Sequence, residues 1–180
     1  MRGILKTTSV VLLATVALAT GARAALPGAV QDSDYAFRQV GSGELRYFGF
    51  AIYDASLWSP GGQFTGFVPG EPVALSLWYK RGFSREALLE ITAKAWGKLD
   101  TGTPSQRARW IGQLDSIWTD VEPGDNMTTV VVPGSETRFY DQTGLKGRIE
   151  DPAFGPAFLG IWLDQRSVVG DLRTELLGLE

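Results

Sequence analysis

The stretch Leu45–Trp58 constrains the fold most, because apolar side chains occupy both alternating sets of positions along it. Interpreted as one strand, it has one face with Phe48, Phe50, Ile52 and Trp58 and another with Leu45, Tyr47, Ala51, Tyr53 and Leu57. An antiparallel sheet commonly leaves one face to solvent, so a strand that is apolar on both faces indicates that helices cover one side. We expect the other side to meet a ligand, another layer or a partner.

The first 24 residues have the pattern of a secretory signal peptide. Arg2 and Lys6 precede a mostly apolar run over 10–19, which is short for a membrane span, and Ala22-Arg23-Ala24 is a small-x-small cleavage pattern. An uncleaved membrane anchor is the alternative. We therefore expect residues 1–24 to be removed on export, which leaves one domain over residues 25–180 with no membrane span of its own.

The composition excludes several kinds of chemistry. The chain has no histidine and no cysteine, so it has no Ser-His-Asp or Cys-His catalytic arrangement, no disulfide and no imidazole or thiolate metal ligand. Gly41-Ser42-Gly43 lacks the later glycine and the helix start of a dinucleotide site. Removal of the leader changes the formal net charge from −3 to −6, which disfavours nucleic acid. We expect no metal, no cofactor and no nucleic-acid partner.

The remaining pattern predicts strands, then two helices, then a strand meander and further helices. We expect strands at 35–42, 45–58 and 73–79, with a turn at Gly43-Glu44 between the first two. Ser84 and Thr103 are predicted N-caps of helices that end near 99 and 117, the second with a first-turn proline and a capping-box glutamine. Strands at 127–132, 137–140 and 145–149 and helices at 151–163 and 171–177 follow. One α+β domain is the economical interpretation.

Three segments together resemble the chalcone isomerase-like proteins, in particular their exported bacterial branch. They are Gly41-Ser42-Gly43 followed by RYFGFAIYDASLW, the stretch Phe139–Asp164, and the short helix after it. The resemblance implies a curved antiparallel sheet with helices packed on one face, an open-faced sandwich with a ligand cleft between the layers. It also implies a bacterial chain that is secreted across the inner membrane and stays in the periplasm.

The catalytic groups of the family are not matched in this chain. In the plant isomerases an arginine, a threonine and a tyrosine surround the enolate oxygen that develops during ring closure, which is oxyanion stabilisation. The matching positions are occupied by Leu45, Phe48 and Phe83. Whether any catalysis remains is therefore open.

Arg46 lies one residue from the position of the family arginine. A one-residue shift along a strand turns a side chain to the opposite face, unless a bulge, for which Gly43-Glu44 is a candidate place, restores it. Arg46 is then either a solvated arginine or the anchor of an anionic ligand group. Arg46 and Tyr47 are the candidate catalytic residues.

The candidate ligand-binding residues are the arginine and the aromatic residues of the predicted strands. They are Arg46, Tyr47, Phe48, Tyr53, Trp58, Trp78 and Tyr79. Small residues between the tyrosines leave either a groove or room for a closely packed helix. The strand end Tyr79-Lys80-Arg81 is either a solvated cap or a holder of a carboxylate at a cleft mouth. Asp54 is a candidate general base or an aspartate that bonds backbone amides.

These observations favour a non-catalytic binder of a small apolar or amphipathic, fatty-acid-like ligand in the cell envelope. The first alternative is an isomerase or lyase that acts on an enone-type or related small molecule. The second is an envelope accessory protein whose exposed apolar face binds another protein. A ligand-sized hollow beneath the strand 45–58 would support the non-catalytic binder, and solid packing there would oppose it. A guanidinium and a phenol that converge there would support the enzyme.

Overall fold

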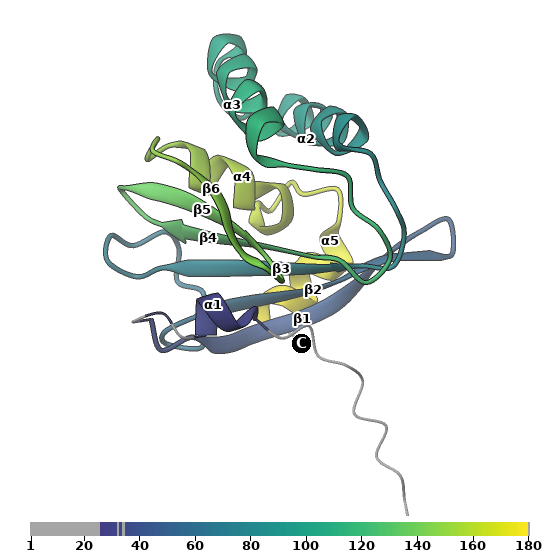
Figure 1. The fold of residues 1–180 in the computed structure, drawn as a ribbon. Coiled ribbons are helices and arrows are strands. Elements are labelled where there is room, and N and C mark those ends of the chain that lie inside the picture. The colour runs from purple at the N-terminus through teal and green to yellow at the C-terminus, as the bar shows by residue number, and fades with distance from the viewer. Residues whose placement is uncertain (1–25, 32, 34, 180) are drawn as a thin grey trace, which may run out of the picture.

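The computed structural model of the chain describes residues 26–31, 33 and 35–179 (Figure 1). Its sheet is an antiparallel meander in which each strand pairs with the next one along the chain. The strands are β1 (Arg38–Tyr47), β2 (Phe50–Ser59), β3 (Val73–Tyr79), β4 (Asn126–Val132), β5 (Glu136–Asp141) and β6 (Gly144–Ile149). The helices are α1 (Gly28–Gln31), α2 (Arg85–Leu99), α3 (Pro104–Ile117), α4 (Phe154–Leu163) and α5 (Gly170–Leu177). The expected α+β class is confirmed. The predicted signal peptide, residues 1–24, lies outside the described residues.

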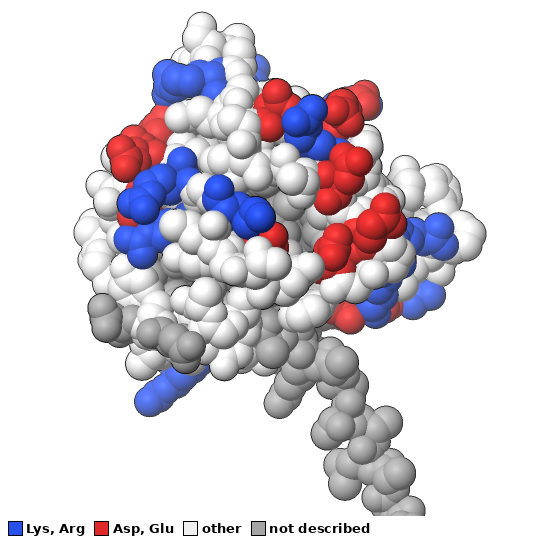
Figure 2. Space-filling view, in the orientation of Figure 1, with Lys and Arg blue, Asp and Glu red and all other residues white. Residues whose placement is uncertain are grey.

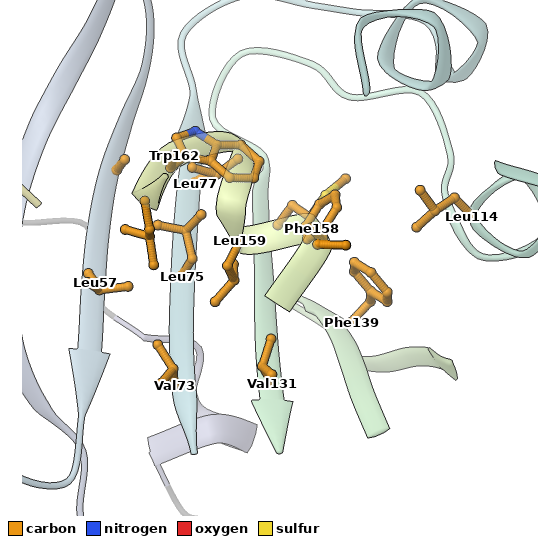
Figure 3. Close-up of a cluster of buried hydrophobic side chains, with 14 of the residues drawn as sticks. Leu57, Val73, Leu75, Leu77, Leu114, Val131, Phe139, Phe158, Leu159 and Trp162 are labelled. Carbon is orange, nitrogen blue, oxygen red and sulfur yellow. The ribbon is translucent and has the colours of Figure 1, made fainter. Parts of the chain in front are cut away.

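The helices on one face of the sheet form two layers. Figure 1 shows α4 between the strands and the pair α2 and α3, with α5 beside it over β1 and β2. Seven of the ten residues of α4 are buried, as is typical of a helix that has protein on more than one side. In Figure 3 its side chains Leu159 and Trp162 lie near Leu75 and Leu77 of β3, and Phe158 lies near Phe139 of β5. The helices therefore cover one face, as predicted.

A smaller apolar cluster lies on the opposite face of the sheet. Leu26 and Val30, from α1 and the residue stretch before it, are buried with Ala74 of β3 and Val130 of β4. These strand residues are one step along from Leu75 and Val131 of the main core, so they point to the other side. The short helix α1 was not predicted, and it covers part of the face that the sequence left unassigned.

The stretch Leu45–Trp58 is not one strand, although Leu45, Tyr53 and Leu57 do share one face and Trp58 does lie on the other. β1 ends at Tyr47, Phe48 and Gly49 form a two-residue turn, and β2 returns from Phe50. Both turn residues have positive φ, +48° and +80°, as in the type I′ turn whose twist matches that of a β-hairpin. The sequence concealed the turn because Phe-Gly is not among the dipeptides that mark it.

The predicted turn and the candidate bulge at Gly43-Glu44 are also wrong. β1 continues through both residues, which pair with Ala55 and Asp54 of β2. The register shifts elsewhere in the hairpin, where Val40 of β1 and Ile52 of β2 are the unpaired extra residues. Bulges of this kind bend a strand, so they account for the curvature of the hairpin without a turn at Gly43.

The helix starts follow the capping chemistry of the sequence, with one exception. The Ser84 hydroxyl accepts from the backbone N–H of Ala87 at 3.2 Å, and Thr103 and Gln106 form the predicted capping box. Asp151, predicted as the N-cap of the helix that ends near 163, instead accepts from the Ala153 N–H and closes a turn before α4. The predicted N-cap of that helix was therefore two residues before the observed one, Ala153.

Two glycines bring α5 into direct contact with the backbone of β1. A Cβ on Gly41 would overlap the carbonyl oxygen of Glu175 and lie 2.6 Å from that of Leu176. A Cβ on Gly43 would overlap the Glu175 carboxylate and lie 2.9 Å from Leu172. Because the obstacles at Gly41 are backbone atoms, they cannot rotate away.

We predict that Gly41→Ala destabilises the protein by about 1–3 kcal/mol, because α5 must move off β1 to admit the methyl group. Urea denaturation followed by circular dichroism measures the change. Gly112→Ala on α3 is the control, since nothing lies within 4 Å of its added Cβ, and removing a mid-helix glycine should stabilise by up to about 1 kcal/mol. Equal stabilities of Gly41→Ala and the parent chain would contradict the close contact.

Candidate ligand groove at the base of the β1–β2 hairpin

Aromatic side chains fill the layer between the sheet and the helices, where a ligand cleft was expected. Trp96, Trp110, Phe139 and Phe154 are at most 1% exposed. The ring centroids of Trp96, Trp110 and Phe154 lie 5.4–6.0 Å apart in edge-to-face pairs, and Phe154 stacks on Phe158 at 5.5 Å. In the described part of the chain, core side chains therefore occupy this layer, where the hypothesis of a non-catalytic binder expected a ligand-sized hollow.

The indole N–H groups of three tryptophans in this layer are satisfied by protein acceptors. Trp96 donates to the Ala157 carbonyl, Trp110 to the Asp151 carboxylate and Trp162 to the Tyr53 hydroxyl, each at 2.9 Å. Each buried N–H thereby avoids the free-energy cost of an unpaired donor. The tryptophans of the helices serve the core, as the sequence analysis had interpreted them.

Tyr53 and Tyr79, two of the predicted ligand-binding residues, are buried in the same core. Their ring centroids lie 5.9 Å apart. Burial raises the pKa of Tyr53 to about 12, against a smaller opposing effect of the Trp162 hydrogen bond. Burial also raises the pKa of Tyr79. Both phenols therefore stay neutral at physiological pH and are buried, and Tyr53 contacts Trp162 of α4.

Trp58 and Trp78, also predicted to line a pocket, lie on the opposite face of the sheet. Trp58 packs against the cluster beneath α1, and its N–H donates to the Ser56 hydroxyl at 2.8 Å. Trp78 is half-buried and pairs across the sheet with Asp54, two residues before Ser56, so it shares that face. The predicted set of binding residues is thus divided between the two sides of the sheet.

An open groove of about 830 Å³ lies along the end of the β1–β2 hairpin that contains the turn. The hairpin, the strand end after β3 and the turn before β4 supply its walls. The lining residues are Tyr47, Phe48, Phe50, Ala51, Ile52, Lys80, Arg81, Gly82, Phe83 and Pro123. Aromatic and aliphatic side chains predominate, so the groove offers an apolar surface with two basic residues at its edge.

Of these two basic residues, Arg81 is the one whose charge is available to a ligand. Its guanidinium lies 4.4 Å from the centre of the Phe50 ring, a cation–π contact, and no described carboxylate forms an ion pair with it. The ammonium of Lys80 is already paired with Glu44 and, at 2.7 Å, with Asp54. Hydrogen bonds to these two carboxylates raise the pKa of Lys80.

Arg46 and Tyr47, the predicted catalytic pair, project from opposite faces of β1. The Arg46 side chain is 59% exposed, pairs with Glu44 and donates to the Gly49 carbonyl at 2.8 Å. Hydrogen bonds from Lys80 and Arg46 lower the pKa of Glu44. Tyr47 lines the groove. The two side chains therefore do not converge on one reacting atom. A binding or catalytic role for either residue stays a prediction. Asp54, the candidate base, is held by Lys80.

Two of the three positions matched to the family's catalytic groups line the groove with apolar side chains. Phe48 stands at the threonine position and Phe83 at the tyrosine position, while Leu45, at the arginine position, packs against the main core. Phe50, Ile52, Phe83 and Pro123 were not among the predicted binding residues. Arg81 was foreseen only as part of a basic strand end, because nothing in a linear pattern distinguishes a paired cation from an unpaired one.

Other kinds of site find no support in the described residues. They contain no cluster of three or more acidic residues that would hold a metal ion. Within the same part of the chain, every helix is too short or too polar to cross a bilayer.

An open antiparallel meander with helices on one face and a groove beside its leading hairpin defines the architectural class. Residues 21–178 match the family described as chalcone isomerase-like, and the chain belongs to that family. A fatty-acid binding protein of Arabidopsis thaliana has a similar solved structure, with a TM-score of 0.63 and 11% sequence identity over 84% of this chain and 90% of that one. An uncharacterised protein of Haemophilus influenzae is 25% identical over 147 residues, 79% of this chain and 68% of the relative. The predicted family and fold are confirmed.

The buried tyrosines predict how stability depends on alkaline pH. A phenol whose pKa is raised in the folded state stabilises the fold fully below its unfolded value of 10.0 and loses that contribution as pH rises toward about 12. We therefore expect the free energy of unfolding to fall across this interval. In Tyr53→Phe the fall should be smaller, and the stability at neutral pH should drop by about 1–3 kcal/mol because the Trp162 N–H loses its acceptor. Denaturant titrations at several pH values measure both effects, and an unchanged slope in Tyr53→Phe would contradict the assignment.

Proposed function

We propose that the chain is a non-catalytic binder of an amphipathic organic anion of the fatty-acid type, and that the groove beside the hairpin is its site. The observation that carries the proposal is the combination of an apolar, aromatic-lined groove with a guanidinium that no described carboxylate neutralises. A ligand with an apolar body and one anionic end matches both features.

The groove residues would contact the two ends of such a ligand in different ways. An acyl chain laid against Phe50, Ile52 and Phe83 would gain about 25 cal/mol for each Å² of apolar surface removed from water. A carboxylate at Arg81 would accept charge-assisted hydrogen bonds from a planar guanidinium, which suits a two-oxygen acceptor. Because the groove is open, part of the ligand stays in water, so we expect moderate affinity and rapid exchange.

The comparisons support a binder rather than an isomerase. The Arabidopsis neighbour of similar fold is described as a fatty-acid binding protein. In this chain the matched catalytic positions are apolar, and the remaining polar candidates, Arg46 and Tyr47, lie on opposite faces of β1. Stabilising a developing enolate requires donors that converge on one oxygen.

We predict that Arg81→Ala weakens binding of a long-chain fatty acid about tenfold, the cost of losing a charge-assisted hydrogen bond of about 1.5 kcal/mol or more. Arg46→Ala is the matched control, since it removes a neighbouring arginine whose guanidinium is held by Glu44 outside the groove. Displacement of a fluorescent fatty acid, with native mass spectrometry of the gently purified protein, gives both affinities.

The corresponding long-chain alcohol should bind the parent chain about as weakly as the acid binds Arg81→Ala. In the first case the ligand lacks its negative charge, and in the second the protein lacks the positive charge of Arg81. Equal losses in Arg46→Ala and Arg81→Ala would move the anion site away from Arg81. Absence of binding to the parent chain would remove the proposed function.

We also propose that the protein works in the cell envelope after export. The support is the basic start, short apolar run and small-x-small pattern of residues 1–24. The prediction is that protein recovered from the periplasmic fraction of the native bacterium begins at Ala25, as read by mass spectrometry of its N-terminal peptide. An intact leader on all of the protein would support the membrane-anchor alternative.

A further inference from the structure

The tip of the β1–β2 hairpin is a projecting aromatic surface that the rest of the described residues leave mostly exposed. β3 pairs with β2 only as far as Tyr53, so residues 46–51 pair solely with each other and extend past the sheet (Figure 1). Tyr47, Phe48 and Phe50 are 65%, 83% and 57% exposed. Figure 2 shows the projection with uncharged atoms at its end and basic side chains beside them. The rings of Tyr47 and Phe48 meet edge to face at 4.5 Å.

Folding alone does not explain the residue at the turn. Phe48 has a φ of +48°, a conformation that bulky side chains rarely adopt and that asparagine and glycine favour at this position of a type I′ turn. A large apolar group is thus held in a disfavoured backbone conformation while most of its surface faces water. The edge-to-face contact with Tyr47 covers little of the ring, since Phe48 stays 83% exposed, and such a local cost points to a role outside the fold.

We propose that this tip inserts into the interface of an anionic lipid bilayer. Aromatic side chains prefer the headgroup boundary of a membrane, where their apolar rings leave water. Arg46 and Lys80 beside the tip are paired with Glu44 and Asp54, and Glu122 lies near Gly82, but no described carboxylate forms an ion pair with Arg81, which lies over Phe50. The guanidinium of Arg81, next to the aromatic side chains, complements an anionic headgroup.

The shape of the tip favours a lipid surface over a protein partner. A stable protein interface uses about 20–30 residues on each side, whereas the projecting stretch Tyr47–Phe50 is a narrow turn. The turn is fixed by ladder hydrogen bonds, so little ordering entropy is lost on insertion. The docking proposal does not depend on ligand binding, although docking would place the mouth of the groove at the membrane surface.

Vesicle flotation of the full chain tests the proposal with a variant designed to keep the hairpin. Phe48→Asn creates the preferred turn sequence, so its thermal stability should equal or exceed that of the parent chain. Its fraction bound to vesicles containing phosphatidylglycerol should fall about five- to tenfold, since an interfacial phenyl group is lost. Ile91→Asn on α2 is the control, because it removes another exposed apolar side chain away from the tip. Residues 1–24 are the same in all three chains.

A site-specific label gives a second readout, because the chain contains no cysteine. An environment-sensitive fluorophore attached to Phe48→Cys should shift to the blue on phosphatidylglycerol vesicles, and the same label on Ile91→Cys should not. Raised salt should weaken the effect. Equal flotation of Phe48→Asn and the parent chain, equal binding to pure phosphatidylcholine, or a solution dimer that Phe48→Asn dissolves would each overturn the proposal.

Discussion

The aromatic cluster around α4, between that helix, the sheet and the pair α2 and α3, is the feature on which the rest of the structure depends. Trp96, Trp110 and Trp162 reach into it from three different helices, and each donates its indole N–H to a protein acceptor. Large rings remove much apolar surface from water, and the directed hydrogen bonds fix how the helices sit on the strands. The cluster is therefore both the main source of stability and the reason that α4 can be apolar on nearly all sides.

The same cluster explains why the candidate site lies at the edge of the molecule. Core side chains occupy the space between the layers, and the proposed groove lies where the β1–β2 hairpin extends past the sheet. There the groove combines apolar walls with Arg81, and the positions matched to the catalytic groups of the family bear Phe48 and Phe83. An open apolar groove beside an exposed aromatic tip suits exchange of an amphipathic molecule better than chemistry that requires exclusion of water.

Local sequence chemistry predicted much of the fold. The capping residues Ser84 and Thr103 marked two helices, and proline, glycine and β-branched patterns marked the meander from β4 to β6. The first hairpin was misinterpreted because its turn uses Phe48 in a conformation that the dipeptide rules do not associate with phenylalanine. That error hid the projecting turn, but Leu45, Tyr53 and Leu57 still share the core face and Trp58 still lies opposite, as the alternation predicted.

The sequence by itself determined the class of the fold, the family and the exclusion of thiol and imidazole chemistry, because caps, periodicity and composition are local or additive properties. Only the tertiary structure decided that Tyr53 and Tyr79 are core residues, that Trp58 packs in the cluster with α1, and that Phe48 lies in a turn. The tertiary structure also decided that Lys80 is paired with Glu44 and Asp54, whereas Arg81 has no ion pair with a described carboxylate. Those facts depend on which distant side chains become neighbours, and neighbours are set by register and packing across strands far apart in the sequence.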